Sequence, residues 1–193
     1  MATRAGERKT QILEHLALML EQPHVARITT AALAARMHVS EAALYRHFAS
    51  KAQMFEGLID SIDLTLNTLA QDVTQRAPDG LTRARELVHG LLVFAEHHRG
   101  LSRVLTGEAL VTEDNRLQTR VNEQLDQIRQ ALHQMLRDGV IDGSLPAGAD
   151  TTALAHVILH VVLGKWLMFA HSGWRDLPTA DFAAQLAWLL PRP

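Results

Sequence analysis

Histidine is the residue of this chain with the widest chemical repertoire, because it can ligate a metal or transfer a proton near neutral pH. The chain holds eleven histidines, including the pair His156 and His160, which lie about one helical turn apart. A zinc site needs three or four converging ligands, and a zinc hydrolase of the zincin type carries a glutamate beside its first histidine, whereas residues 157–159 are all apolar. The sequence also lacks a GxSxG elbow and a glycine-rich phosphate loop. We therefore expect hydrogen-bonded histidines in the core or at an interface, no metal, no cofactor and no enzymatic activity.

A second group of polar side chains, between residues 29 and 51, suits contacts with nucleic acid. Hydroxyl, imidazole and ammonium groups donate to phosphate oxygens, whereas small side chains let a helix lie deep in the major groove and contact a thymine methyl. We expect Tyr45, His47 and Lys51 chiefly to hold phosphates. The other predicted DNA contacts are Thr30, Ser40, Glu41, Ala42 and Ala43 near base edges, together with Thr29 and Arg46.

The elements that would position these side chains are two short helices joined by a turn. Thr29 and Ser40 each precede a helix-forming run, so both hydroxyls are predicted to cap a helix N-terminus. Residues 38–39 interrupt the run between them, and Leu44 and Phe48 would face the same way on the second helix. This pattern indicates a helix-turn-helix, whose second helix lies in the DNA major groove. An ordinary helical hairpin in a bundle is the alternative.

The remaining helices are predicted from apolar residues spaced by three and four and from turn residues. Ser50 and Gln53 form a capping-box pattern that opens a long helix ending near Arg76. Pro23 is expected to end the first helix, and Gly139 a long polar one. No segment alternates with a period of two, so we predict an all-α fold with about nine helices. The other predicted helical segments are 8–20, 81–98, a short piece within 101–110, 113–138, 151–171 and 178–190.

Composition favours a globular intracellular protein. Of 193 residues, 47% are apolar and 21% charged, and there is no cysteine, so disulfides and thiolate metal sites are excluded. The polar N-terminus lacks the apolar core of a signal peptide. The most apolar segment, residues 151–170, contains His156, His160 and Lys165. These side chains would be costly at the centre of a bilayer, so we predict a buried helix and no membrane association.

The N-terminal part of the chain is basic. Residues 1–51 contain seven Lys and Arg against four Glu, although the whole chain has a net charge of −2. A basic head on an acidic body is the distribution expected when one end faces phosphates. Within the head, Arg4, Arg8 and Lys9 are interpreted either as a frayed, solvated terminus or as an arm that contacts the minor groove.

The stretch Ile28 to Lys51 resembles the DNA-binding domain of the TetR family of bacterial regulators. The family's Thr-Thr-x-x-Leu-Ala opening is similar to residues 29–34, and its Leu-Tyr-x-His-Phe-x-x-Lys motif is similar to residues 44–51. The resemblance implies a helix-turn-helix domain at residues 1–51 and a helical dimerisation and regulatory domain at residues 52–193. It further implies a homodimer that binds a palindromic site in double-stranded DNA.

Members of that family dimerise through a four-helix bundle made from the last two long helices of each subunit. Aromatic residues near the end of the chain are then either anchors of that interface or core residues within one subunit. The residues concerned are Trp166, Phe169, Trp174 and Trp188.

Two branches of the family remain open for this chain. The segments LALMLE, LTGEAL and DNRLQTRVNEQ are similar to a nucleoid-occlusion branch, whose members bind DNA and antagonise the division protein FtsZ. That resemblance implies a cytoplasmic, nucleoid-associated protein whose outer surface contacts FtsZ. The alternative is a transcriptional repressor that responds to a small-molecule effector. The expected partner surface comprises Asp60, Asp63, Arg83, Arg85, Glu86 and His97.

Overall fold

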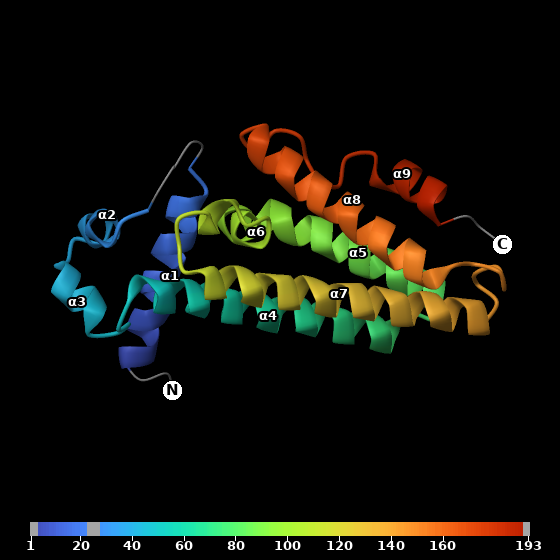
Figure 1. The fold of residues 1–193 in the computed structure, drawn as a ribbon, viewed down its shortest axis with the longest axis horizontal. Helices are drawn as coiled ribbons and strands as arrows, with labels where there is room; N and C mark the ends of the chain where they lie inside the picture. The colour runs from blue at the N-terminus through green and yellow to red at the C-terminus, as the bar shows by residue number, and fades with distance from the viewer. Residues whose placement is uncertain (1–3, 23–27, 191–193) are drawn as a thin grey trace. The chain divides into compact units, whose positions relative to one another are not determined.

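The computed structural model describes residues 4–22 and 28–190, which form nine α-helices and one short 3-10 helix (Figure 1). Within those ranges the chain contains no β-strand, so the predicted all-α fold is confirmed. The end of the first helix, predicted at Pro23, lies outside the described residues. The elements are α1 (Arg4–Leu20), α2 (Thr30–Arg36), α3 (Glu41–Tyr45), α4 (Lys51–Arg76), α5 (Gly80–His97), α6 (Arg99–Leu105), η1 (Glu108–Leu110), α7 (Asn115–Ile141), α8 (Thr151–His171) and α9 (Phe182–Leu189).

The helices are organised in two compact units. The first unit draws on residues 1–62 and 98–121, and the second on residues 63–97 and 122–193. The long helices α4 and α7 each begin in the first unit and end in the second. The division predicted between residues 51 and 52 does not coincide with the boundary of these two packing units, and it stays a prediction.

In the first unit, α1 packs closely against α6. A Cβ atom on Gly100 would lie 2.0 Å from the carbonyl oxygen of Ala17, so the helices approach this closely only because residue 100 is glycine. The Arg103 guanidinium donates to the carbonyl oxygens of Leu20 and Gln22, each at 3.1 Å. It thereby satisfies carbonyls at the C-terminal end of α1, where helical partners run out. Contacts from α6 therefore hold α1 and its C-terminal end in place.

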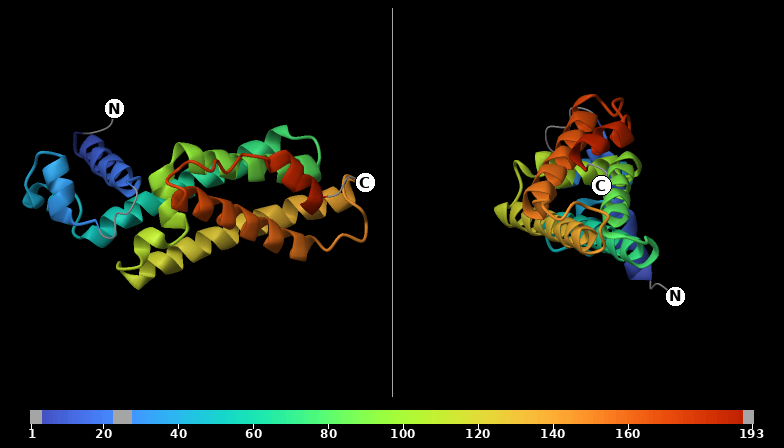
Figure 2. Two further views of the ribbon diagram at one scale, coloured as in Figure 1. Left: turned by 90° about the horizontal axis from the view of Figure 1, so that it is seen from above. Right: turned by 90° about the vertical axis from the view of Figure 1, so that its right-hand side faces the viewer.

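In the second unit, α5 and α8 pack against each other (Figure 1). Trp166 and Phe169 are both 0% exposed, and the Trp166 indole Nε1–H donates to the Leu91 carbonyl oxygen at 3.0 Å. Both side chains therefore belong to the core of one subunit, and their interpretation as interface anchors is wrong. The last helix, α9 (red in Figure 2), contacts α5 through Phe182, whose ring stacks on His89 with 5.8 Å between centroids.

One face of α8 is not covered by the part of the chain that the structure describes. Val157 and Met168 are 44% and 57% exposed, and the two histidines on this helix, His156 and His160, are exposed as well. The alternative that they are core histidines is therefore wrong for the single chain. By length and apolar composition α8 meets the criterion for a membrane span, but the core helix of a globular protein meets the same criterion.

Two predicted helix ends differ from the structure. Gly139 lies inside α7 rather than ending it. The start of α5 packs closely against this glycine, since a Cβ on Gly80 would lie 2.1 Å from the Gly139 nitrogen and a Cβ on Gly139 would lie 3.2 Å from the Leu81 nitrogen. The last helix begins at Phe182 instead of Pro178. The Thr179 backbone N–H and hydroxyl both donate to Glu96, at 2.9 Å and 2.6 Å, so this residue is held in a turn.

Candidate nucleic-acid interface

The two short helices are capped as the sequence predicts. The Thr29 hydroxyl oxygen accepts from the Ala32 backbone N–H at 3.1 Å, and the Ser40 hydroxyl oxygen accepts from Ala43 at 3.3 Å. Each cap satisfies an N–H group that the first helical turn leaves without a backbone partner. The local signals in the sequence were sufficient to place both helix starts.

The turn between the helices is a Schellman motif. The Val39 N–H donates to the Ala34 carbonyl at 3.0 Å, and the His38 N–H donates to the Ala35 carbonyl at 3.1 Å. His38 has a φ of 54°, in the left-handed region that this motif requires and that glycine usually occupies. The turn therefore ends α2 with a left-handed residue that carries a Cβ.

A side-chain link joins the start of α2 to α3. The Thr30 hydroxyl donates to a Glu41 carboxylate oxygen at 2.6 Å, and the Tyr45 hydroxyl donates to the Thr30 hydroxyl oxygen at 3.4 Å. The three residues were predicted individually as DNA contacts, but nothing in the sequence indicates that they bond to one another. Their network holds α3 at a defined angle to α2 before any ligand binds.

The outward and inward faces of α3 and the following turn agree with the predicted periodicity. Leu44 is 1% exposed and Phe48 is 7% exposed, so both lie in the core of the first unit. Ala42, Tyr45 and Arg46 are exposed. The side chains of Arg46 and His47 make no hydrogen bond or ion pair within the described residues. The structure thus presents a small residue and an unneutralised cation on the side opposite the core. The remaining predicted contacts are exposed at Thr29, Ser40 and Glu41 and half-buried at Thr30, Ala43 and His47.

Lys51, the predicted phosphate contact at the start of α4, is already paired within the chain. Its ammonium lies 2.5 Å from a Glu113 carboxylate oxygen and 5.5 Å from the centre of the Phe55 ring. Asp60, further along α4, pairs with Arg120 at 2.9 Å. Sequence reasoning missed both pairs, since partners some sixty positions apart leave no local signal.

Capping at the start of α4 follows the predicted box with one shift. The Ser50 hydroxyl oxygen accepts from the Gln53 N–H at 3.1 Å, as expected. The Gln53 side-chain oxygen accepts from the Ala49 N–H at 2.8 Å, one residue before the expected partner.

The N-terminal basic residues also differ from expectation, because α1 begins at Arg4 and so includes them. Arg8 donates to Gln11 at 2.9 Å, and the Lys9 ammonium lies over the Phe48 ring. The interpretation as a frayed terminus is therefore wrong for Arg8 and Lys9, and the minor-groove contact stays a prediction.

The charges of the predicted partner surface are largely engaged within the chain. Arg83 donates to the Ala77 carbonyl at 3.2 Å, and Glu86 pairs with Arg76 at 3.0 Å. Asp60 belongs to the first unit, whereas the other five residues belong to the second. Arg85 donates to the Leu190 carbonyl at 3.4 Å, Asp63 is half-buried, and His97 is exposed. This surface stays a prediction.

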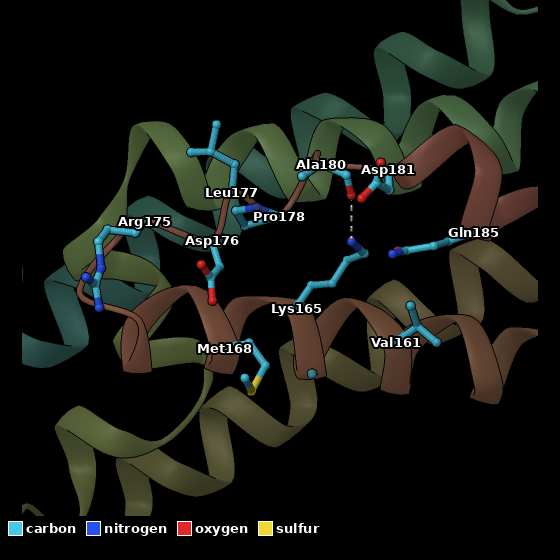
Figure 3. A pocket seen from close by; sticks show the side chains of 11 residues that line it. Val161, Lys165, Met168, Arg175, Asp176, Leu177, Pro178, Ala180, Asp181 and Gln185 are labelled. Atoms are coloured by element: carbon cyan, nitrogen blue, oxygen red, sulfur yellow. Dashed lines mark hydrogen bonds between the residues drawn. The ribbon is translucent and has the colours of Figure 1, made fainter.

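Two of the hollows that the described residues line lie on the surface of the second unit. The larger, of about 680 Å³, lies between α8 and the segment leading to α9 (Figure 3). Its Lys165 ammonium donates to the Ala180 carbonyl at 3.2 Å, and burial lowers the pKa of this group while Asp181 acts in the opposite direction. The smaller hollow, of about 500 Å³, is bordered by apolar residues, including Leu154, Val157 and Trp188. Within the described residues, no three His, Asp or Glu side chains converge as metal ligands do.

Comparison with known proteins identifies relatives along nearly the whole chain. Residues 20–58 match the family described as bacterial regulatory proteins, tetR family, and residues 78–192 match the tetracyclin repressor-like, C-terminal domain. The chain is 41% identical to the nucleoid occlusion factor SlmA of Idiomarina loihiensis over 96% of its length and 94% of that protein. It is 43% identical to the same factor of Shewanella loihica over 92% and 90% of the two chains.

Solved structures reproduce the fold at much lower sequence identity. The transcriptional regulator FadR of Bacillus subtilis, in complex with stearoyl-CoA, superimposes with a TM-score of 0.78. The match covers 94% of this chain and 97% of that one at 14% identity. At this identity the likeness concerns the fold alone.

Proposed function

On the premise that this chain belongs to the tetR family of bacterial regulatory proteins, and within it to the nucleoid occlusion factor SlmA family, we propose that it acts as a nucleoid occlusion factor. It binds palindromic double-stranded DNA as a homodimer and, when bound, prevents the division protein FtsZ from assembling nearby. The observation that carries this proposal is the identity of about 40% to SlmA proteins over 96% of the chain.

The DNA-binding part of the proposal rests on the geometry of the first unit. Ala42 is exposed on the side of α3 opposite the core-facing Leu44, which lets α3 approach base edges closely. Arg46 and His47 are free to bond phosphates, and Tyr45 is 45% exposed beside them. Residues 1–51 then form the DNA-binding domain, and residues 52–193 the dimerisation and regulatory domain. The family is one of regulatory proteins, and the proposal contains no catalytic step.

The homodimer is supported by apolar surface that the single chain leaves open. Val157 and Met168 on α8 are exposed, and Trp188 on α9 is 89% exposed. Gly164 lies among them, with open space where a Cβ would be. Exposed apolar residues and a close-approach glycine on neighbouring helices suit a second copy of the same helices. Two-fold symmetry of the protein would be matched by a palindromic site.

The decisive experiment for occlusion is FtsZ assembly followed by light scattering and sedimentation. With the protein and a specific palindromic DNA, polymers should be disrupted more strongly than with the protein alone or with DNA alone. The Ala42→Asp protein is the control, because it should lose the DNA-dependent increase. Failure of the DNA to alter an FtsZ effect, or no effect on FtsZ at all, would contradict the occlusion function. Genomic footprinting adds a second readout: many chromosomal sites agree with occlusion and a nucleoid location in the cytoplasm.

A repressor with a small-molecule effector is the second candidate, favoured by the apolar hollow of about 500 Å³ beside Val157. An effector releases DNA only if it binds two conformations of the protein with different affinity. A single genomic site beside the protein's own gene, together with a metabolite that releases the DNA, would support this function instead.

A further inference from the structure

The ion pair between Lys51 and Glu113 joins the start of α4 to the segment that leads into α7. The two side chains are only 20% and 9% exposed, so the carboxylate in particular is shielded from water. Glu113 belongs to the same compact unit as α2 and α3. Lys51 follows Arg46 by five residues, at the point where the chain leaves the candidate interface.

An ammonium group that is paired with a carboxylate is less available to a phosphate than an unpaired cation is. To give full charge to a phosphate, Lys51 must loosen its bond to Glu113. The carboxylate is then left shielded from water without its counter-ion, or its segment must move to reach water. Arg46 faces no such competition, because it has no ion pair or side-chain hydrogen bond within the described residues. Of the two cations predicted to contact phosphates, Lys51 is therefore already paired with a carboxylate, whereas Arg46 is not paired within the described residues.

We propose that Glu113 sets the DNA affinity of this protein by competing with DNA phosphate for the Lys51 ammonium. Binding of DNA opens the pair, and the cost of opening it lowers affinity for all sequences alike. The segment 106–114 is thereby coupled to DNA, since it is held by Lys51 only when DNA is absent. The coupling is reciprocal: anything that holds this segment in place weakens DNA binding. The inference rests on the proposed DNA-binding function.

The test is a set of DNA-binding titrations over a range of salt concentrations. Glu113→Gln keeps the side-chain shape but removes the competing charge. It should tighten binding by about threefold to tenfold on specific and unrelated DNA, while the slope of log affinity against log salt stays as in the wild type. Lys51→Ala should weaken binding on all sequences and reduce that slope by about one.

A double-mutant cycle separates competition from a general loss of negative charge. In the Lys51→Ala background, Glu113→Gln should change affinity no more than Asp114→Asn does. Asp114 is the matched control, since it is the adjacent carboxylate and pairs with Arg116 at 2.8 Å instead of Lys51. Equal gains from Glu113→Gln in both backgrounds would overturn the proposal.

Amide hydrogen exchange supplies a readout that a merely structural role would not change. Exchange within residues 106–114 should rise when DNA is added to the wild type, and should already be high in Glu113→Gln without DNA. No change on adding DNA to a wild type that binds DNA would overturn the inference and leave the proposed function standing. A wild type that binds no DNA would instead overturn the proposed function. Thermal unfolding of each variant verifies that it is folded.

Discussion

At the scale of single residues, the candidate interface depends on the short side chain of Ala42 as much as on its polar groups. Ala42 is exposed on α3, opposite the buried Leu44. A methyl group there leaves room for a base edge, whereas any longer side chain would hold the helix away. A carboxylate would add repulsion from the phosphates.

Ala42→Asp should therefore abolish specific DNA binding, weakening it by at least about a hundredfold, because like charges brought together across an interface cost several kcal/mol. Fluorescence anisotropy with a labelled site measures the loss. Ala147→Asp, at an exposed alanine in the loop before α8, is the matched control and should bind nearly as the wild type. Equal losses in both variants would refute the assigned face.

A carboxylate outside the interface makes folding depend on pH. Asp142 accepts from the Ser144 N–H at 2.9 Å and from the Gly80 N–H at 2.7 Å. Hydrogen bonds from Ser144, and to a smaller extent from Gly80, lower the pKa of this carboxyl below its ordinary value of 3.8. A lowered pKa means that the unfolded chain binds the proton more tightly. The stabilisation is therefore complete above that value and is lost as the pH falls through the folded-state pKa.

Urea unfolding between pH 6 and the acid limit measures this dependence. The wild type should lose stability more steeply on acidification than Asp142→Asn, which has no proton to gain. Asp176→Asn, at an exposed carboxylate in the segment before α9, should keep the wild-type slope. Parallel curves for wild type and Asp142→Asn would show that these hydrogen bonds do not favour the charged form.

At the scale of elements, the turn between α2 and α3 holds a conformation that its sequence disfavours. His38 has a φ of 54°, where a residue with a Cβ is strained by about 1–2 kcal/mol. Glycine removes the strain but adds freedom to the unfolded chain. His38→Gly should therefore raise stability by a net of about 0.5–1 kcal/mol.

Chemical denaturation gives that difference directly. Gly148→Ala is a useful counterpart, since a Cβ there meets nothing within 4 Å and its φ is not left-handed. It should change stability little or raise it slightly. A loss of stability in His38→Gly would mean that the histidine ring makes a contact that outweighs the strain.

The bounds of a helix were predictable from the sequence where the interactions that set them join residues close together in the chain. Thr29 and Ser40 cap their helices as predicted because an N-cap involves residues only three positions apart. Gly139 was misassigned because its role depends on a residue far away in the sequence. It lets the start of α5, at Gly80, pack closely against α7, and the sequence alone does not distinguish such a glycine from one that ends a helix. The pairing of Lys51 with Glu113 was missed for the same reason.

At the scale of the whole molecule, the proposed assembly is a dimer of two chains. Val157 is 44% exposed on the uncovered face of α8. If a second copy covers it, Val157→Asp places an unpaired charge in the interface and should weaken self-association by at least about thirtyfold. Asn67→Asp, at an exposed position on α4, should leave the dimer intact. Sedimentation equilibrium at micromolar concentration decides this, and a monomeric wild type would refute the dimer.

The placement of the tryptophans also gives the molecule a built-in optical reporter. The Trp166 indole is 0% exposed and hydrogen-bonded, so its emission should lie at short wavelength and resist collisional quenchers. Trp188 is 89% exposed, and in an isolated chain it should emit at long wavelength and be quenched readily by iodide. If a second copy covers Trp188, dilution should shift the spectrum to the red and increase quenching. Trp188→Phe should abolish both changes, so self-association can be followed without attaching a dye.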